Sequence, residues 1–357
     1  MNKKLALFPM TRDMCAIVRY PMLLREYALS HLLVPDYKRL EGIDISILDG
    51  GSQAGMVLSC YSKDKIAECD TLFVEYDEKL KDLSLYKEAI NDAKELGKEV
   101  ILSYMMTKKL ETPCESWPEG LPALQSPEND RMYECSVPVI MVFSQGPNID
   151  QFAIELALRK YFIEAGYKVG QIGSREVSRF FGFSGMPGFI YEQRNAYEII
   201  LKLNKYINDL EKAEEPELMI IGVPGGIMKY SNNILQGLGL LPFIVSNAVK
   251  SDVSILGMYH SIYIKDFFDN MCTFGQYRLG CPIKFFGVSN VSASIDARTN
   301  EIKMEYVDLD SDFVLQGIQD EMAFDEHYLF NVLDNESVKK ACIAVHDVLV
   351  GNARYVH

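Results

Sequence analysis

A short turn between an apolar run and an amphipathic helix is the first place to look for chemistry in this sequence. The run covers residues 138–143, and the turn reads Ser-Gln-Gly-Pro-Asn-Ile-Asp-Gln over residues 144–151. A glycine-containing turn at a helix start can bind phosphate, because its backbone N–H groups and the helix dipole both favour an anion. A phosphate-binding loop (P-loop) that supports hydrolysis also needs a lysine for the β- and γ-phosphates and a Ser or Thr for Mg²⁺.

The last two residues of this turn have the wrong types for that reaction. In every register, Asp150 and Gln151 stand where the lysine and the hydroxyl belong. A carboxylate beside a triphosphate is repulsive, so ordinary P-loop ATPase activity is not expected. Two interpretations stay open, a plain strand–helix turn and a remodelled ligand site. In the second, backbone amides around Gly146 and the side chains of Asn148 and Gln151 would contact the ligand. Asp150 would then cap the helix.

A second apolar run, at residues 218–223, ends in Pro224, Gly225 and Gly226. P-loop enzymes place an acid at the end of a neighbouring strand to order Mg²⁺ and water, but this run has Gly222 there. Glycines at such a position allow either the close approach of a ligand or a backbone of positive φ, and both readings stay open. Lys229 is a candidate substitute for the missing lysine, although an isolated surface lysine is the simpler interpretation.

Two asparagines follow further apolar runs that we interpret as strands. Asn247 comes after residues 243–245, and Asn290 after residues 285–288. Related folds place a base-reading asparagine at such ends, but turn residues are more common there. No catalytic residue is predicted. The candidate ligand-binding residues are Ser144, Gly146, Asn148, Asp150, Gln151, Pro224, Gly225, Gly226 and Asn290.

Metal chemistry is not expected. The eight cysteines form no CxxC pair and the five histidines are dispersed, so the spacings of zinc and iron–sulfur sites are absent. Scattered cysteines of this kind are typical of reduced thiols in the cytoplasm. A nucleotide is the one cofactor left open.

The elements that would hold these residues alternate between strands and helices. In the first part of the chain we expect strands at 5–8, 43–48, 71–74 and 100–103, and helices at 21–31 and 83–96. From residue 137 a second series begins, with helices at 149–165 and 197–210. Alternation of this kind predicts parallel sheets with helices on both faces. The expected fold class is α/β with two domains, an N-terminal Rossmann-like parallel sheet and a C-terminal P-loop NTPase-like doubly wound sheet.

The length of 357 residues favours two domains. We expect a Rossmann-like domain at 1–110, a proline-rich linker at 111–136, a degenerate P-loop-like domain at 137–335, and a C-terminal helix and tail at 336–357. The net charge of −14 argues against nucleic acid or an anionic membrane as partner. No apolar run reaches the roughly 18 residues that span a bilayer, and the apolar start is too short for a signal peptide. A cytoplasmic protein is therefore expected.

Three stretches resemble the clostridial peptide maturation system protein family, whose members sit beside radical-SAM genes in clusters for ribosomally made natural products. They are residues 144–174, 180–187 and 219–228. The resemblance implies an accessory or scaffold role in maturing a ribosomally synthesised peptide, without ATP hydrolysis. The implied partners are the precursor peptide or a radical-SAM maturase, with a homodimer left open. The family carries over no catalytic residues.

A more distant likeness is to proteins with a Rossmann-like domain before a P-loop domain, which include a D-glutamate N-acetyltransferase. That group keeps the P-loop lysine, and this sequence does not. The competing hypothesis is therefore an enzyme, a ligase or transferase that uses a nucleotide or acyl donor on a peptide or amino acid. Whether the protein is an enzyme stays open at this point.

Overall fold

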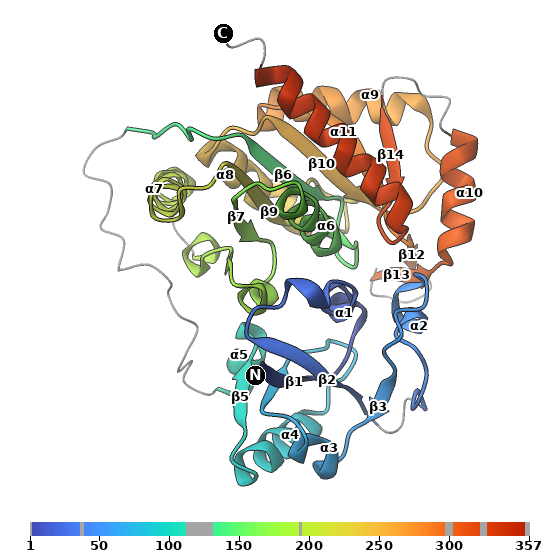
Figure 1. The fold of residues 1–357 in the computed structure, drawn as a ribbon. Helices are drawn as coiled ribbons and strands as arrows, with labels where there is room; N and C mark the ends of the chain where they lie inside the picture. The colour runs from blue at the N-terminus through green and yellow to red at the C-terminus, as the bar shows by residue number, and fades with distance from the viewer. Residues whose placement is uncertain are drawn as a thin grey trace. The chain divides into compact units, whose positions relative to one another are not determined.

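The computed structural model describes residues 2–35, 39–111, 131–192, 195–296, 303–321 and 327–353. The chain divides into two compact units, residues 1–120 with 179–182, and residues 121–178 with 183–357. Most of the expected linker at 111–136 lies outside the described residues. Each unit has a parallel sheet of its own, and the predicted α/β class with parallel sheets is confirmed (Figure 1).

The first unit contains a five-stranded sheet in the order β3-β2-β1-β4-β5, with every pair parallel. Its strands are β1 (Lys3–Phe8), β2 (Tyr27–Val34), β3 (Leu58–Cys60), β4 (Thr71–Val74) and β5 (Glu99–Leu102). Its helices are α1 (Cys15–Arg19), α2 (Ser46–Asp49), α3 (Lys63–Ala67), α4 (Leu83–Glu95) and α5 (Tyr104–Leu110). Helix α4, expected at 83–96, buries Tyr86, Ala89, Ile90 and Ala93 on one face, the spacing of an amphipathic helix.

Two expectations for this unit are wrong. Residues 43–48 do not form a strand. The Asp44 carboxylate instead accepts the backbone N–H groups of Ser46, Ala54 and Gly55, and the short helix α2 follows. Residues 27–31 belong to strand β2 rather than to a helix, because they pair with β1 in the sheet. Pairing with a neighbouring strand here outweighs a helix-like apolar spacing.

The second unit contains a seven-stranded parallel sheet in the order β14-β11-β10-β6-β9-β7-β8. Its strands are β6 (Val139–Ser144), β7 (Val169–Gly173), β8 (Ser184–Gly185), β9 (Leu218–Gly226), β10 (Val253–Met258), β11 (Ile283–Val288) and β14 (Tyr328–Asn331). Its helices are α6 (Gln151–Glu164), α7 (Ala196–Glu214), α8 (Leu240–Ala248), α9 (Lys265–Phe274), α10 (Ser311–Glu321) and α11 (Asn335–Ala353). An antiparallel hairpin of β12 (Val291–Asp296) and β13 (Lys303–Asp308) follows β11.

Helices cover both faces of this larger sheet. One face carries the main apolar core, to which α7, α8, α9 and α10 contribute buried side chains. Helix α6 packs beside α11 (Figure 1). The expected strand at 243–245 is instead part of α8, so Asn247 lies on a helix and donates to the Phe243 carbonyl one turn earlier, at 2.7 Å.

The order of the strands places a switch point at β6. From β6 the chain runs to β7 and β9 on one side, and then crosses to β10 and β11 on the other. In open parallel sheets, ligands bind at the carboxyl ends of the strands beside such a switch. The turn at 144–151 begins at the carboxyl end of β6 and therefore lies where sheets of this kind bind ligands.

Candidate functional site

The first backbone N–H groups of the 144–151 turn donate hydrogen bonds within the protein. The Gln145 N–H donates to the Gly257 carbonyl on β10 at 2.8 Å. The Gly146 N–H donates to the Ser144 hydroxyl oxygen at 3.2 Å, and the Ser144 hydroxyl donates to the Gly146 carbonyl at 2.5 Å. Pro147 has no N–H to offer. These first amides, which would cradle a phosphate in a P-loop, are therefore not directed at a ligand.

The carbonyl oxygens of the same turn accept hydrogen bonds from side chains. With its amide oriented by its hydrogen-bond partners, Gln236 donates from its side-chain nitrogen to the Gln145 carbonyl at 2.8 Å and to the Met228 carbonyl at 3.1 Å. The Tyr259 hydroxyl donates to the Pro147 carbonyl at 2.7 Å. Burial and the neighbouring Tyr306 raise the pKa of Tyr259, so it remains a neutral donor. The turn presents acceptors where a phosphate site presents donors.

Two glycines form the walls around the Gln236 carboxamide. A Cβ at Gly146 would lie 2.5 Å from one terminal atom of that carboxamide and 2.5 Å from the Tyr259 hydroxyl oxygen. A Cβ at Gly226 would lie 2.3 Å from the other terminal atom. We call the space between these two glycines, which the Gln236 carboxamide fills, the 146/226 slot.

The stretch Pro224, Gly225 and Gly226 belongs to β9 itself, as an irregular end of the strand. Val142 of β6 pairs with Gly222 and Ser144 pairs with Gly226, so β9 bulges between these pairs. Gly225 has a φ of 83°, a conformation that favours glycine. Each of the two glycines is therefore required for a different reason. Gly225 has a positive φ, and Gly226 leaves room for the Gln236 side chain.

Asp150 does not cap helix α6. No side-chain hydrogen bond closes the helix start, and our expectation of a capping carboxylate is wrong. Its Oδ2 instead accepts the hydroxyl of Ser289, which is fully buried just past the end of β11. Asn148, in the same turn, has a left-handed φ of 60°, which an asparagine tolerates better than most residues.

Gln151 is engaged inside the sheet. Its side-chain amide donates to the Val142 carbonyl of β6 at 2.7 Å and to the Val223 carbonyl of β9 at 2.8 Å. Only 8% of the residue is exposed. Its N–H groups therefore link two neighbouring strands rather than point at a ligand, in contrast to the neutral donor that the sequence suggested.

Asn290 follows β11 as expected, but it lies in a buried polar network rather than at the surface. It donates to the Ser311 hydroxyl at 2.7 Å and accepts from the Asn331 amide at 2.7 Å. These contacts join the ends of β11 and β14 to the start of α10. Lys229 donates to the Asn232 side chain at 2.8 Å on an exposed loop.

A buried polar stripe on helix α6 was missed by the sequence reasoning. Gln151, Glu155 and Arg159 follow one another at four-residue spacing, and all three are at least nine-tenths buried. Spacing of four residues places side chains on one helix face, here the face toward the sheet. Polar residues at this spacing within an otherwise apolar helix were a visible signal.

Glu155 is the most unusual member of this stripe. The residue is fully buried, and its Oε2 accepts the Ser174 N–H at 3.1 Å. A Cβ at Gly222 would lie 2.2 Å from its Oε1. The carboxyl group therefore packs against the strand position where P-loop enzymes carry their own acid. Burial raises the pKa of Glu155 to about 7, and the hydrogen bond from Ser174 opposes part of this rise.

Several buried polar atoms near the end of β7 lack a hydrogen-bond partner among the described residues. They are Glu155 Oε1, Gln171 Nε2 and Ser178 Oγ, and all three residues have no exposed surface. The Arg159 guanidinium donates to the Val169 carbonyl at 3.2 Å and to Gln171 Oε1 at 3.5 Å. Unsatisfied groups of this kind are rare in protein interiors and are costly.

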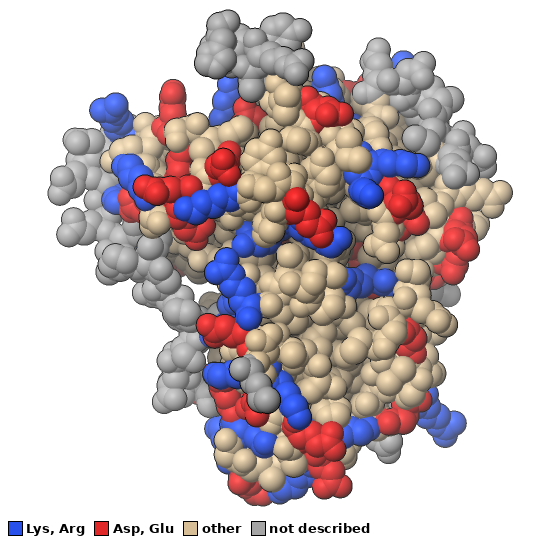
Figure 2. Space-filling model, viewed as in Figure 1, with Lys and Arg blue, Asp and Glu red and all other residues tan. Residues whose placement is uncertain are grey.

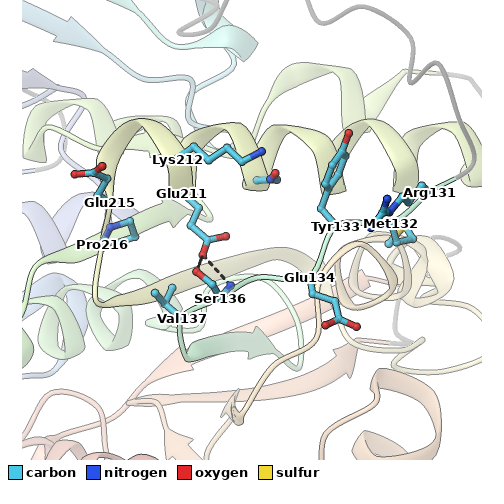
Figure 3. Close-up of a pocket in the computed structure, with 11 residues that line it drawn as sticks. Arg131, Met132, Tyr133, Glu134, Ser136, Val137, Glu211, Lys212, Glu215 and Pro216 are labelled. Carbon is cyan, nitrogen blue, oxygen red and sulfur yellow. Dashed lines mark hydrogen bonds between the residues drawn. The ribbon is translucent and has the colours of Figure 1, made fainter.

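A surface cavity of about 1020 Å³ lies between the segment at 131–137 and helix α7 (Figure 3). Asn204 of α7 bonds both the N–H and the carbonyl of Tyr133 at 2.8 Å, and Glu211 accepts the Ser136 N–H at 2.8 Å. The lining is mixed in charge. It consists of Arg131, Met132, Tyr133, Glu134, Ser136, Val137, Asn208, Glu211, Lys212, Glu215 and Pro216. Polar side chains of helix α7 therefore hydrogen-bond the backbone of the segment at 131–137.

Three further properties bear on the kind of partner. Across the part of the chain that the structure describes, no group of three or more His, Cys, Asp or Glu side chains could hold a metal ion. On the face drawn in Figure 2, Lys and Arg side chains lie among Asp and Glu side chains rather than gathering apart from them. Among the same described residues, no helix has the length and apolarity needed to cross a membrane.

Comparison with known proteins identifies a shared fold. No protein-family model matches this chain, and no curated protein matches it either. The crystal structure of a DUF1611 family protein from Anabaena variabilis is similar over 96% of this chain and 100% of that chain, with 12% identity and a TM-score of 0.61. This similarity extends over both units and bears out the two-domain α/β architecture. At 12% identity it concerns the fold alone.

A second solved structure, a pseudomurein peptide ligase type C from Methanothermus fervidus, matches with 11% identity and a TM-score of 0.27. The match covers 71% of this chain and 38% of that chain. A score this low does not support an argument about fold or function. Membership of the clostridial peptide maturation family is not shown by these comparisons.

Proposed function

We propose that this protein is an accessory protein in the maturation of a ribosomally synthesised peptide, and that it binds the precursor peptide or its radical-SAM maturase without hydrolysing ATP. One observation carries the proposal. In the turn that would hold nucleotide phosphates, the N–H groups of Gln145 and Gly146 are already hydrogen-bonded. Its Gln145 and Pro147 carbonyl oxygens accept hydrogen bonds from the side chains of Gln236 and Tyr259. The family resemblance of residues 144–174 and 219–228 supports the peptide-maturation context.

A triphosphate has little to bind at this turn. Phosphate oxygens would meet the carbonyl oxygens of Gln145 and Met228, which is repulsive. The Asp150 carboxylate adds a negative charge at the helix start, and Lys229 is bonded within its own loop. A ligase or transferase that uses a nucleotide needs free N–H donors and a lysine at this turn. The accessory role is therefore the better-supported function.

The loops at the same edge of the sheet offer surface for a peptide or protein partner. Parallel strands β9 and β10 flank β6, so the loops that follow them begin at the same edge of the sheet. Large apolar side chains on these loops and at the start of α8 are exposed to solvent, and exposed apolar patches are typical of interaction sites. They are Leu235 (49% exposed), Leu238 (62%), Leu240 (52%), Ile262 (90%) and Ile264 (66%).

The test is a binding measurement with the full-length protein and the products of the genes beside its own, by calorimetry and pull-down. We expect the wild type to bind the precursor peptide or the maturase, and a double change Ile262→Ser with Ile264→Ser to weaken binding by about tenfold or more. Ile343→Ser on α11, an equally conservative loss of an exposed isoleucine (41% exposed), should leave binding unchanged.

Two results would overturn this function. One is no binding of the wild type to either gene product. The other is steady ATP turnover by the purified protein in the presence of the peptide. A scrambled precursor of the same composition serves as the control for nonspecific apolar binding.

A further inference from the structure

The Gln236 carboxamide is held in the 146/226 slot by a backbone turn of unusual geometry. Gln236, Gly237, Leu238 and Gly239 all have positive φ, at 46°, 65°, 57° and 70°. Left-handed backbone is unfavourable for residues that carry a Cβ, and here two of the four do. Leu235 and Leu238, on either side of Gln236, are largely exposed. The turn therefore holds one polar side chain inward at the expense of strained backbone and exposed apolar side chains.

The chemistry of the slot is specific for a group with N–H donors. The Gln145 and Met228 carbonyl oxygens accept both hydrogens of one amide nitrogen, at 2.8 and 3.1 Å. Gly146 and Gly226 each approach a terminal atom of the carboxamide so closely that a Cβ at either position would collide with it. A primary carboxamide fits these two acceptors and the narrow space between the glycines. A carboxylate or phosphate of similar size would place oxygen against oxygen.

We propose that Gln236 is an internal stand-in for a ligand, and that the 146/226 slot binds the side-chain carboxamide of a glutamine or asparagine in a peptide when residues 236–239 turn outward. The choice of a peptide rests on the proposed function. The slot and its preference for a carboxamide rest on the geometry alone. Binding in trans exchanges the intramolecular hydrogen bonds of Gln236 for the same bonds from the ligand and relieves the strained turn.

The direct test compares three tripeptides, Ala-Gln-Ala, Ala-Glu-Ala and Ala-Met-Ala, by titration calorimetry against full-length wild type and Gln236→Ala. Removing the internal competitor should raise the affinity for Ala-Gln-Ala by about tenfold or more, because the binding-competent open state is no longer a minor population. Neither Ala-Glu-Ala nor Ala-Met-Ala should bind either protein. No gain for Ala-Gln-Ala in a folded Gln236→Ala protein, or equal binding of the three tripeptides, would overturn the inference.

A second variant tests the location of the site. Adding Gly226→Ala to Gln236→Ala places a methyl group in the vacated slot and should abolish the gain. In this background the clash with the carboxamide is gone, and the methyl group lies 3.1 Å from the Cβ that residue 236 keeps. Binding that survives this double change would place the peptide elsewhere and overturn the inference. Gly225→Ala in the same background is the matched control, because a Cβ there lies 3.6 Å from Leu241 and outside the slot. It should keep the gain.

A measurement on the wild type covers the case in which Gln236→Ala does not fold. Saturating Ala-Gln-Ala should speed amide hydrogen exchange over residues 236–239, since the ligand displaces this turn, whereas Ala-Glu-Ala should not. Unchanged exchange with Ala-Gln-Ala would count against the inference. If the precursor peptide binds equally to wild type and Gln236→Ala, the accessory function stands and the slot inference fails. If Ala-Gln-Ala binds but neither gene product does, the slot stands and the accessory function fails.

Discussion

Two successive turns of helix α6 bury polar side chains against the same sheet, with opposite results. Gln151, in the first turn, gives its amide hydrogens to the carbonyls of Val142 and Val223 at 2.7 and 2.8 Å. Glu155, in the next turn, accepts a hydrogen bond from Ser174 through Oε2, and its Oε1 has no partner among the described residues.

This difference gives the two residues different roles: Gln151 stabilises the sheet, whereas the charge of Glu155 depends on pH. A buried amide that meets two carbonyls stabilises the sheet and leaves nothing for a ligand. Burial disfavours the charged form of a carboxyl group, and the single hydrogen bond from Ser174 offsets only part of this effect. The pKa of Glu155 therefore rises to about 7. The turn where P-loop hydrolases bind phosphate therefore has its hydrogen-bonding groups occupied. The next turn of α6 carries a buried carboxyl group, Glu155, whose pKa is raised.

The largest expected effect on stability comes from replacing the hydrogen-bond donor of Gln151 by an acceptor. Gln151→Glu keeps the size of the side chain but sets a carboxylate against the two carbonyls, and should lower the free energy of unfolding by roughly 3 kcal/mol or more at pH 8. Urea unfolding measures this. Gln316→Glu on the exposed face of α10 is the control and should stay within about 0.5 kcal/mol. A loss at Gln151 as small as the control would contradict the structural role.

Glu155→Gln, in the second turn of α6, should instead raise the free energy of unfolding at pH 8. The folded pKa of about 7 lies above the ordinary 4.5, so the folded state binds the extra proton and the wild type loses stability as pH rises from about 4.5 to about 7. The full penalty is roughly 3 kcal/mol above that window. The variant should therefore be more stable than wild type at pH 8, with most of the gain gone at pH 5. Thermal melts across pH check this, and a gain independent of pH would argue against a titrating Glu155.

A third change tests the contact between Glu155 and the sheet. Gly222→Ala sets a Cβ against the buried carboxyl group and should cost about 2 kcal/mol. In a Glu155→Ala background the clash is absent, so the cost should mostly disappear, an interaction that a double-mutant cycle measures. Gly225→Ala, whose cost of about 1 kcal/mol comes from its positive φ, should be the same in both backgrounds. Equal costs of Gly222→Ala in the two backgrounds would contradict the packing of Glu155 on β9.

The smallest effect is expected at Asp150. Asp150→Ala and Ser289→Ala each remove the same hydrogen bond and should each lower the free energy of unfolding by about 1 kcal/mol. The double variant should cost less than the sum of the two single variants, because the two changes remove the same bond. Fully additive losses would indicate that the two side chains act independently.

Much of the larger fold was readable from residue patterns. Long apolar runs such as residues 138–143 and 218–223 predicted buried strands, and the one-sided stripe at 197–210 predicted a surface helix. All three are confirmed. The errors fall on short segments at 27–31, 43–48 and 243–245. In runs this short the apolar pattern fits both helix and strand, and the choice depends on which distant segment pairs with them.

The site was only partly predictable for a related reason. Missing catalytic types at Asp150, Gln151 and Gly222 can be read directly from the turn and the strand end. The partners that engage the turn cannot, because Gly257, Tyr259 and Gln236 are brought to it from far along the chain by the sheet topology. Glu155 is different, because the four-residue spacing of Gln151, Glu155 and Arg159 can be read from the sequence alone.

The most direct test of the central claim is titration of ATP with Mg²⁺ into the full-length wild-type protein by calorimetry. We expect no saturable heat at millimolar nucleotide, because the turn offers carbonyl oxygens and a carboxylate where phosphate needs amides and a lysine. Saturable binding with a micromolar dissociation constant, lost in Gly146→Val, would contradict it. That result would mean that the turn at 144–151 rearranges to expose its amides and still works as a phosphate site.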